Sequence, residues 1–175
     1  MLDALDIKIL EVLQERGRTK RNELADMVGL SVPSLSERIK KLEEHGVIEG
    51  YYTKLNRKHF NFDIMAFVQV VMDSSKNFSK LSDNVKKTPE ILECYAVLGE
   101  GSHIMKAVVK DSFALEQLLN KIQSWPGVTR TVTSFVLSAV KETTKLNIKK
   151  EEFIPNSSAI SDENSNFFGK ITSNY

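Results

Sequence analysis

The stretch TKRNELADMVGLSVPSLSERIKKLEEHG, residues 19–46, predicts two short helices joined by a tight turn. Thr19 is expected to cap the first helix, and Gly29 to end it. Ser31 is expected to cap the second helix, and Pro33 suits a first turn that needs no backbone donors. This layout is typical of a helix-turn-helix, a motif that reads DNA.

The second of these helices has one apolar and one polar face. Leu35, Ile39 and Leu42 recur at i, i+4 and i+7 and predict a narrow core stripe. On the outer side, basic side chains could neutralise phosphates, serines could contact phosphates or bases, and a glutamate could accept a hydrogen bond from cytosine N4. A merely solvated face is the ordinary alternative. The predicted DNA-binding residues are Ser31, Ser34, Ser36, Glu37, Arg38, Lys40 and Lys41.

The motif is flanked by a helix and by a short extended segment. Residues 2–15 place apolar side chains at helical spacing, with two aspartates in the first turn, where acids suit the positive end of the helix dipole. Residues 47–55, VIEGYYTKL, predict a short strand or wing, and residues 56–63 a linker. Residues 1–55 are therefore expected to form a DNA-binding domain.

From residue 64 onward, the apolar spacing changes from helical to strand-like. Near-continuous apolar or β-branched runs alternate with two amphipathic helices. The predicted elements are strand 65–72, helix 78–87, strand 91–98, strand 104–109, helix 113–122 and strand 128–140. The order β-α-β-β-α-β is that of a ferredoxin-like domain, expected over residues 64–148. Together the two domains predict an α+β protein.

The first of these strands predicts that the chain is not a monomer. Two helices cover only one face of a four-stranded sheet, yet both alternating sets of side chains in residues 65–72 are largely apolar. One set is Met65, Phe67 and Val71, and the other is Ala66, Val68, Val70 and Met72. An uncovered apolar face favours packing against another copy of the chain.

Residues 149–175 differ in composition from the rest of the chain. Ser, Asn and acids dominate residues 156–166, a composition that cannot offset the entropy lost on ordering. We expect a flexible polar tail, in which Phe167, Phe168 and Ile171 could form a short anchor.

Eight short stretches are each weak alone but stand in a specific order. In the first domain they are LDIKIL (5–10), ELADMVGLS (23–31), RIKKLE (38–43) and GVIEGY (46–51). In the second they are PEILECY (89–95), WPGV (125–128), TVT (131–133) and VK (140–141). Over about residues 2–148, the chain resembles the Lrp/AsnC family, or feast/famine regulatory proteins. The resemblance implies a winged helix-turn-helix joined to a RAM-type ligand-binding domain. It also implies a cytoplasmic transcription factor that dimerises, often forms octamers, and responds to amino acids.

The resemblance implies an effector site at the turn between the second and third strands, at an interface between dimers. That turn usually reads like Gly-Asp-Tyr-Asp in the family, whereas here a serine replaces the second acid. A carboxylate suits an effector's ammonium group, and a hydroxyl is a weaker partner. Hydroxyls of the last strand could converge on the turn, although a simple hairpin turn is the alternative. The predicted effector-binding residues are Gly99, Glu100, Gly101, Ser102, His103, Thr131 and Thr133.

Composition and motifs argue against several other classes of protein. A net charge of +1 does not fit a protein that covers DNA without sequence preference, since such proteins are usually far more basic. The single Cys94, expected to be a small core residue, and three histidines without ligand spacing predict neither a disulfide nor a metal site. The sequence has no Gly-rich phosphate loop and no HExxH or GxSxG motif, so we expect neither an enzyme nor a cofactor.

The expected partners are double-stranded DNA, further copies of the chain and an amino-acid-like effector. No stretch approaches the roughly 20 apolar residues that span a bilayer, and the first residues do not predict a signal peptide, so we expect a cytoplasmic protein. The alternative is a ligand-sensing assembly module whose first domain contacts protein. A protein-binding helix, however, would expose apolar anchors rather than serine and lysine.

Overall fold

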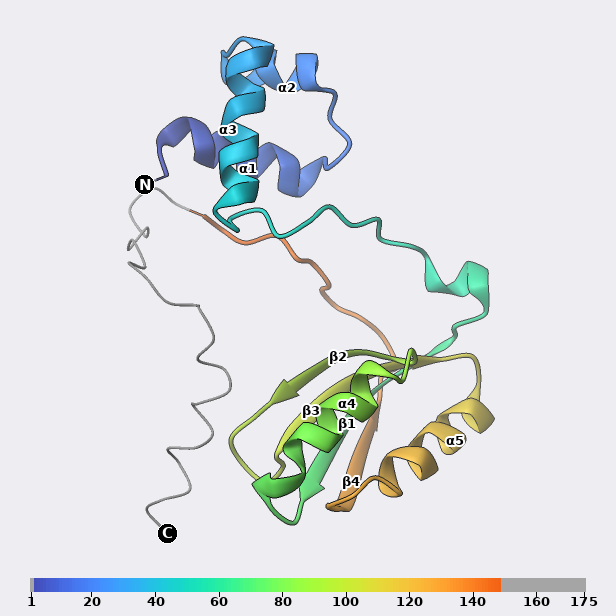
Figure 1. The fold of residues 1–175 in the computed structure, drawn as a ribbon. Coiled ribbons are helices and arrows are strands. Elements are labelled where there is room, and N and C mark those ends of the chain that lie inside the picture. The colour runs from blue at the N-terminus through green and yellow to red at the C-terminus, as the bar shows by residue number, and fades with distance from the viewer. Residues whose placement is uncertain (1, 149–175) are drawn as a thin grey trace. The chain divides into compact units, whose positions relative to one another are not determined.

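The computed structural model describes residues 2–148, which form two compact units (Figure 1). The first unit joins residues 2–54 with residues 141–148, and the second comprises residues 55–140. Residues 141–148, which we expected at the end of the second domain, are thus grouped with the first. The expected tail, 149–175, lies outside the described residues. Within the described part, no helix is both long and apolar enough to cross a membrane.

The first unit contains three helices, α1 (Ala4–Glu15), α2 (Arg21–Val28) and α3 (Val32–Glu44). Each helix contributes one apolar stripe to a common core, and the stripe of α3 is the one predicted from its spacing. The buried side chains are Ile9, Leu10, Leu24, Ala25, Val28, Leu35, Ile39 and Leu42. Because this core holds α3 by one face, its opposite face is exposed to solvent.

The turn between α2 and α3 has the predicted form. Gly29 ends α2 with a φ of 74°, in the left-handed region that glycine enters without strain. Ser31 caps α3, since its Oγ accepts a hydrogen bond from the backbone N–H of Ser34 at 3.3 Å. The helix-turn-helix prediction is therefore confirmed at its centre.

The start of α2 differs from the prediction. Thr19 does not cap α2, which begins at Arg21 after an N-terminal flanking residue, Lys20, that makes no side-chain cap bond. The Thr19 hydroxyl instead donates to the carbonyl of Arg16 at 2.7 Å. This bond closes the turn that follows α1, so the hydroxyl stabilises the preceding helix end rather than the next helix start.

The strand or wing expected at residues 47–55 does not form a hydrogen-bonded strand. A strand needs a neighbour for its backbone groups, and the described residues provide none here. Val47 and Ile48 instead donate to the carbonyl of Leu42, at 2.9 and 3.1 Å, and so extend the end of α3. The expected linker contains one short 3-10 turn, Arg57–Phe60.

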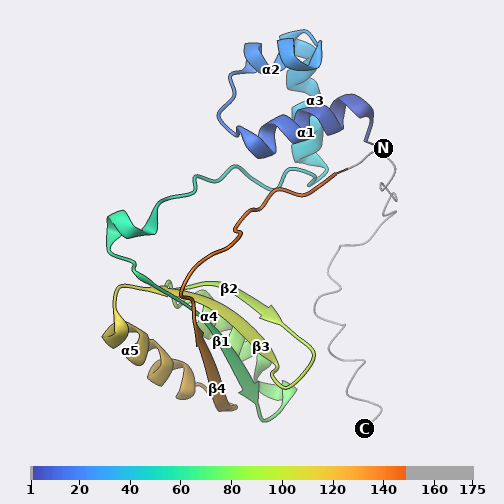
Figure 2. The ribbon, with the colours of Figure 1, turned by 180° about the vertical axis from the view of Figure 1, so that it is seen from behind.

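The second unit is an antiparallel sheet with two helices on one face (Figures 1 and 2). In chain order the elements are β1 (Ile64–Met72), α4 (Phe78–Lys86), β2 (Ile91–Ala96), β3 (His103–Val109), α5 (Ser112–Gln123) and β4 (Val128–Phe135), with a 3-10 turn at Ser75–Asn77. The strand order is β2-β3-β1-β4. The predicted βαββαβ order is confirmed.

Two strands are shorter than predicted. β4 ends at Phe135 rather than residue 140, because β1, its only neighbour among the described strands, begins at Ile64 and offers little further backbone. The last bond joins the Val136 N–H to the Met65 carbonyl at 2.9 Å. β2 ends at Ala96 because the following residues belong to the turn before β3.

The two faces of the sheet differ in burial. On the helix-covered face of β1, Ala66, Val68 and Val70 are fully buried. The two valines belong to a core whose buried members are Val68, Val70, Leu81, Ile91, Met105, Ala107, Val109, Leu118, Ile122 and Trp125. The opposite face leaves large apolar side chains exposed, among them Phe67 (39%) and Val132 (42%). That a second copy covers this face stays a prediction.

Candidate DNA interface and effector site

The start of α3 presents two serine hydroxyls to solvent. Ser31 and Ser34 are both exposed, and their Oγ atoms are 2.8 Å apart. They lie at the N-terminal end of the helix, where unpaired backbone N–H groups and the helix dipole favour an anion. This end of α3 is therefore suited to a phosphate or to a base edge.

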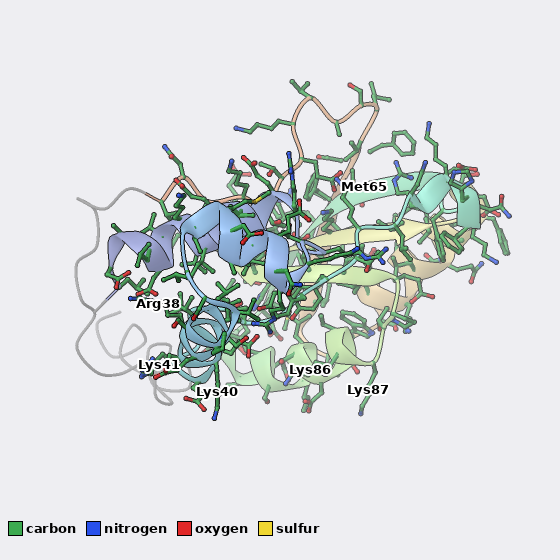
Figure 3. The ribbon with its side chains drawn as sticks, turned by 90° about the horizontal axis from the view of Figure 1, so that it is seen from above. Arg38, Lys40, Lys41, Met65, Lys86 and Lys87 are labelled. Carbon is green, nitrogen blue, oxygen red and sulfur yellow. The ribbon has the colours of Figure 1, made fainter. Side chains whose placement is uncertain are left out.

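Nearly two helical turns further along, α3 exposes two lysines. Lys40 and Lys41 point away from the helix (Figure 3), and their side chains are 73% and 60% exposed. Each forms an i,i+4 ion pair, Lys41 with Glu37 at 2.7 Å and Lys40 with Glu44 at 3.5 Å. Such exposed pairs are weak, so a phosphate can compete for either lysine. The hydrogen bond and charge of Lys41 lower the pKa of Glu37, which is therefore an ionised acceptor at neutral pH.

Arg38 lies apart from the lysines. Its Nη1 donates to Asp3 Oδ2 at 2.7 Å and to Asp6 Oδ1 at 2.8 Å, at the start of α1, and its side chain is only 30% exposed. These hydrogen bonds raise the pKa of Arg38 further, with Asp6 contributing most. In this structure Arg38 ties α3 to α1, while Ser36, also predicted, is half-buried on the flank of α3.

Two basic residues at the start of α2 were absent from the predicted set. Lys20 and Arg21 are exposed, and they combine positive charge with the positive end of a helix dipole. In a helix-turn-helix the first helix of the motif crosses the DNA backbone. The signal was present in the sequence as two consecutive basic residues before an apolar-periodic segment.

In the second unit, glycines shape the turn between β2 and β3. The Val97 N–H donates to the Ser102 carbonyl at 3.0 Å and closes the turn. Gly99 has a φ of 126°, which side chains rarely adopt. Gly101 lies against Gln69, whose side chain would be only 2.6 Å from an added Cβ. Gly99 thus suits the backbone conformation of the turn and Gly101 leaves room for the Gln69 side chain of β1, whereas Glu100 is exposed between them.

The polar side chains that follow are bound within the fold. Ser102 Oγ donates to the Val70 carbonyl at 3.1 Å, so the 3.0 Å contact between Ser102 Oγ and His103 Nδ1 requires His103 to be the donor there. The His103 ring meets Phe78 edge-on, with centroids 4.9 Å apart. Burial lowers the pKa of His103, which favours the neutral imidazole. Ser102, at the position of the family's second acid, is thus used to hold the turn.

The two threonines of β4 lie at different distances along the sheet from this turn. Val70 of β1 pairs with His103 on one side and with Thr131 on the other, so these residues share one row and one face. With strands about 4.8 Å apart, His103 and Thr131 are about 10 Å apart across the row. Thr133 is opposite Val68, one row further from the turn. The structure therefore brings Thr131 closer to the turn than Thr133. Within the described residues, no cluster of three or more His, Cys, Asp or Glu could hold a metal ion.

Comparison with known proteins finds two matching family models, the second of which extends into residues 141–146. A family model described as winged helix-turn-helix DNA-binding matches residues 2–49, and one described as the Lrp/AsnC ligand binding domain matches residues 65–146. The HTH-type transcriptional regulator FL11 of Pyrococcus horikoshii is 36% identical over 148 residues, covering 85% of this chain and 97% of that protein. The leucine-responsive regulatory protein of Escherichia coli is 35% identical over 151 residues, covering 85% and 92%.

A solved structure agrees with both matches. The complex of a transcriptional regulator from Neisseria meningitidis with L-Met has a TM-score of 0.80 to this chain at 36% sequence identity, covering 83% of this chain and 96% of that one. Each of these matches covers nearly the full length of the relative and more than four fifths of this chain. The chain belongs to the Lrp/AsnC family of helix-turn-helix transcriptional regulators.

Proposed function

We propose that this regulator binds specific double-stranded DNA through the exposed face of α3, as a homo-oligomer in the cytoplasm, and that an amino acid bound by the second unit changes its DNA affinity. The observation that carries the proposal is the outer face of α3. It begins with a capped, serine-bearing N-terminus and continues with two exposed lysines.

In this proposal the side chains of α3 divide into two roles. Lys40 and Lys41 neutralise phosphates, with Lys20 and Arg21 contacting the backbone from the start of α2. Ser34 and Glu37 face base edges in the major groove, where a carboxylate can accept from cytosine N4. A dimer would then bind two half-sites about one helical turn, or a multiple of it, apart. Arg38 contributes by holding α3 against α1.

Genome-wide mapping of bound DNA, followed by gel shifts on the recovered fragments, tests the DNA-binding proposal. We expect a recurring pseudo-palindromic site whose half-sites keep that spacing. Binding without any shared sequence would contradict specific recognition. Light scattering at micromolar concentration tests the oligomer, and a monomer would contradict the proposal that the exposed sheet face is an interface between copies.

An amino acid with an apolar side chain is the effector class we propose for residues 99–103. Two relatives support this class, since one is named leucine-responsive and another was solved with L-Met. Glu100 is the exposed carboxylate of the turn and is the proposed partner for the ammonium group. A thermal-shift screen over the amino acids tests the proposal, with L-leucine and L-methionine expected to raise the melting temperature. No stabilisation by any amino acid would contradict it.

A further inference from the structure

Residues 141–148, here called the strap, lie along the first unit although they follow the second unit in sequence. Their sequence, KETTKLNI, is largely polar, and they form neither helix nor strand. We infer that the strap is part of the DNA-reading unit and positions α1, and through α1 the recognition helix α3. The inference rests on the proposed role of α3.

The main contact of the strap is made by Gln14, in the last turn of α1. Its Oε1 accepts from the backbone N–H of Leu146 at 2.7 Å, and its Nε2 donates to the carbonyl of the same residue at 3.3 Å. The carboxamide thus binds both backbone groups of one residue, as a neighbouring strand would. This contact depends on backbone position and not on the Leu146 side chain, which is exposed.

Other contacts lie before and after this point. Lys145 forms an ion pair with Glu15, which lowers the pKa of that carboxyl group. Glu142 pairs with Lys54 at 3.0 Å. Ile148 is half-buried against the core of the first unit. Each ion pair alone would contribute little at an exposed site, but together with Gln14 and Ile148 they attach the strap at four positions.

The location of these contacts gives them a role in DNA reading. Arg38 fixes the first turn of α1 to α3 through Asp3 and Asp6, whereas Gln14 and Glu15 fix the last turn of α1 to the strap. Directly after that last turn, the chain turns into α2, the first helix of the DNA-binding motif. The strap therefore acts as a positioning element for the α1–α2 turn, without contacting DNA itself.

The test uses the full-length chain with reversed charges. Glu15→Lys and Lys145→Glu are made singly and together, along with Gln14→Ala. Glu11→Lys is the matched control, since Glu11 is exposed on α1 one turn earlier and forms no ion pair within the described residues. Readouts are amide hydrogen exchange across residues 12–21, the affinity for an operator fragment, and the slope of log affinity against log salt.

We expect faster exchange and about tenfold weaker binding for Gln14→Ala, and about threefold weaker binding for each single charge reversal. The double reversal should restore both readouts to within twofold of wild type, and the salt slope should stay unchanged, because no phosphate contact is lost. Glu11→Lys should leave exchange at residues 12–21 unchanged.

Three results would overturn the inference. Wild-type exchange and affinity in Gln14→Ala would show that the strap does not position α1. A shallower salt slope for Lys145→Glu, without rescue by the double reversal, would make Lys145 a direct phosphate contact. Faster exchange with unchanged affinity would leave the strap as a stabilising element only. If the wild-type protein bound no DNA, the DNA-binding proposal would fail, while hydrogen exchange would still decide whether the strap holds α1.

Discussion

The outer face of α3 and the β2–β3 turn use their polar groups in opposite ways. On α3 the hydroxyls of Ser31 and Ser34 and both lysines are exposed and held only by weak local pairs. In the turn, Ser102 and His103 bond to each other, Ser102 also donates to the Val70 carbonyl, and both glycines meet conformational or steric demands. The outer face of α3 is therefore free to exchange its partners, as the proposed DNA contact requires, whereas the proposed ligand would find mainly Glu100 and the backbone in the turn.

The strongest test of the exposed face is removal of its positive charge. Lys40→Ala with Lys41→Ala should weaken binding about a hundredfold at moderate salt to operator and non-operator DNA alike. The slope of log affinity against log salt should become shallower by about 1.8, for two phosphates at about 0.9 each. Lys8→Ala, an exposed lysine on α1, serves as control in the same gel-shift titration. An unchanged slope in the double variant would mean that neither lysine contacts a phosphate.

The corresponding test of the turn is steric. Gly101→Ala should lower the free energy of unfolding by about 1–3 kcal/mol, because the new Cβ would overlap Gln69. Adding Gln69→Ala should recover part of that loss in urea titrations, since it removes the overlapping atoms. Gly17→Ala is the control, where the nearest atom is 3.7 Å away. If Gly101→Ala lowers the free energy of unfolding equally with and without Gln69→Ala, overlap with Gln69 is not the cause of the loss.

Arg38 tests whether every basic residue of α3 contacts DNA or whether this one only stabilises the fold. Arg38→Ala should cost about 1–3 kcal/mol of stability, since the nearly buried Asp6 carboxylate, 13% exposed, loses its charged partner. If Arg38 acts only within the fold, the salt slope of the folded variant will equal that of wild type. A shallower slope would mean that Arg38 contacts a phosphate, as the sequence predicted.

The smallest expected effect is a pH dependence in the turn. Burial lowers the pKa of His103 below its ordinary 6.5, so the unfolded chain binds the proton more tightly. The stability that His103 contributes is therefore fully present above pH 6.5 and is lost as the pH falls below it. In His103→Gln, the fall in melting temperature between pH 7 and pH 5 should be shallower than in wild type. An equal fall would mean that other groups cause it.

Local patterns predicted most of the architecture. The 3.6-residue spacing of Leu35, Ile39 and Leu42 identified the buried face of α3, and alternation with amphipathic helices identified the βαββαβ order. These succeeded because one element's period determines which of its side chains are buried.

The features that the sequence did not predict depend on contacts between segments that are distant in sequence. Arg38 lies at the edge of a polar helix face in sequence, and only the packing of α1 brings Asp3 and Asp6 to it. The end of β4 is set by the start of β1, and the different rows of Thr131 and Thr133 by pairing with β1. Strand register and tertiary ion pairs cannot be read from one segment alone.

The grouping of residues 141–148 with the first unit has a consequence for synthesis. Domains generally fold as units while the chain emerges from its N-terminus. All of residues 55–140 precede the strap, so the ligand-binding unit is complete before the last part of the DNA-reading unit has been made. The order in which the units are completed is thus the reverse of their order in sequence. During synthesis the sheet of the second unit can therefore form before the first unit has received its last segment.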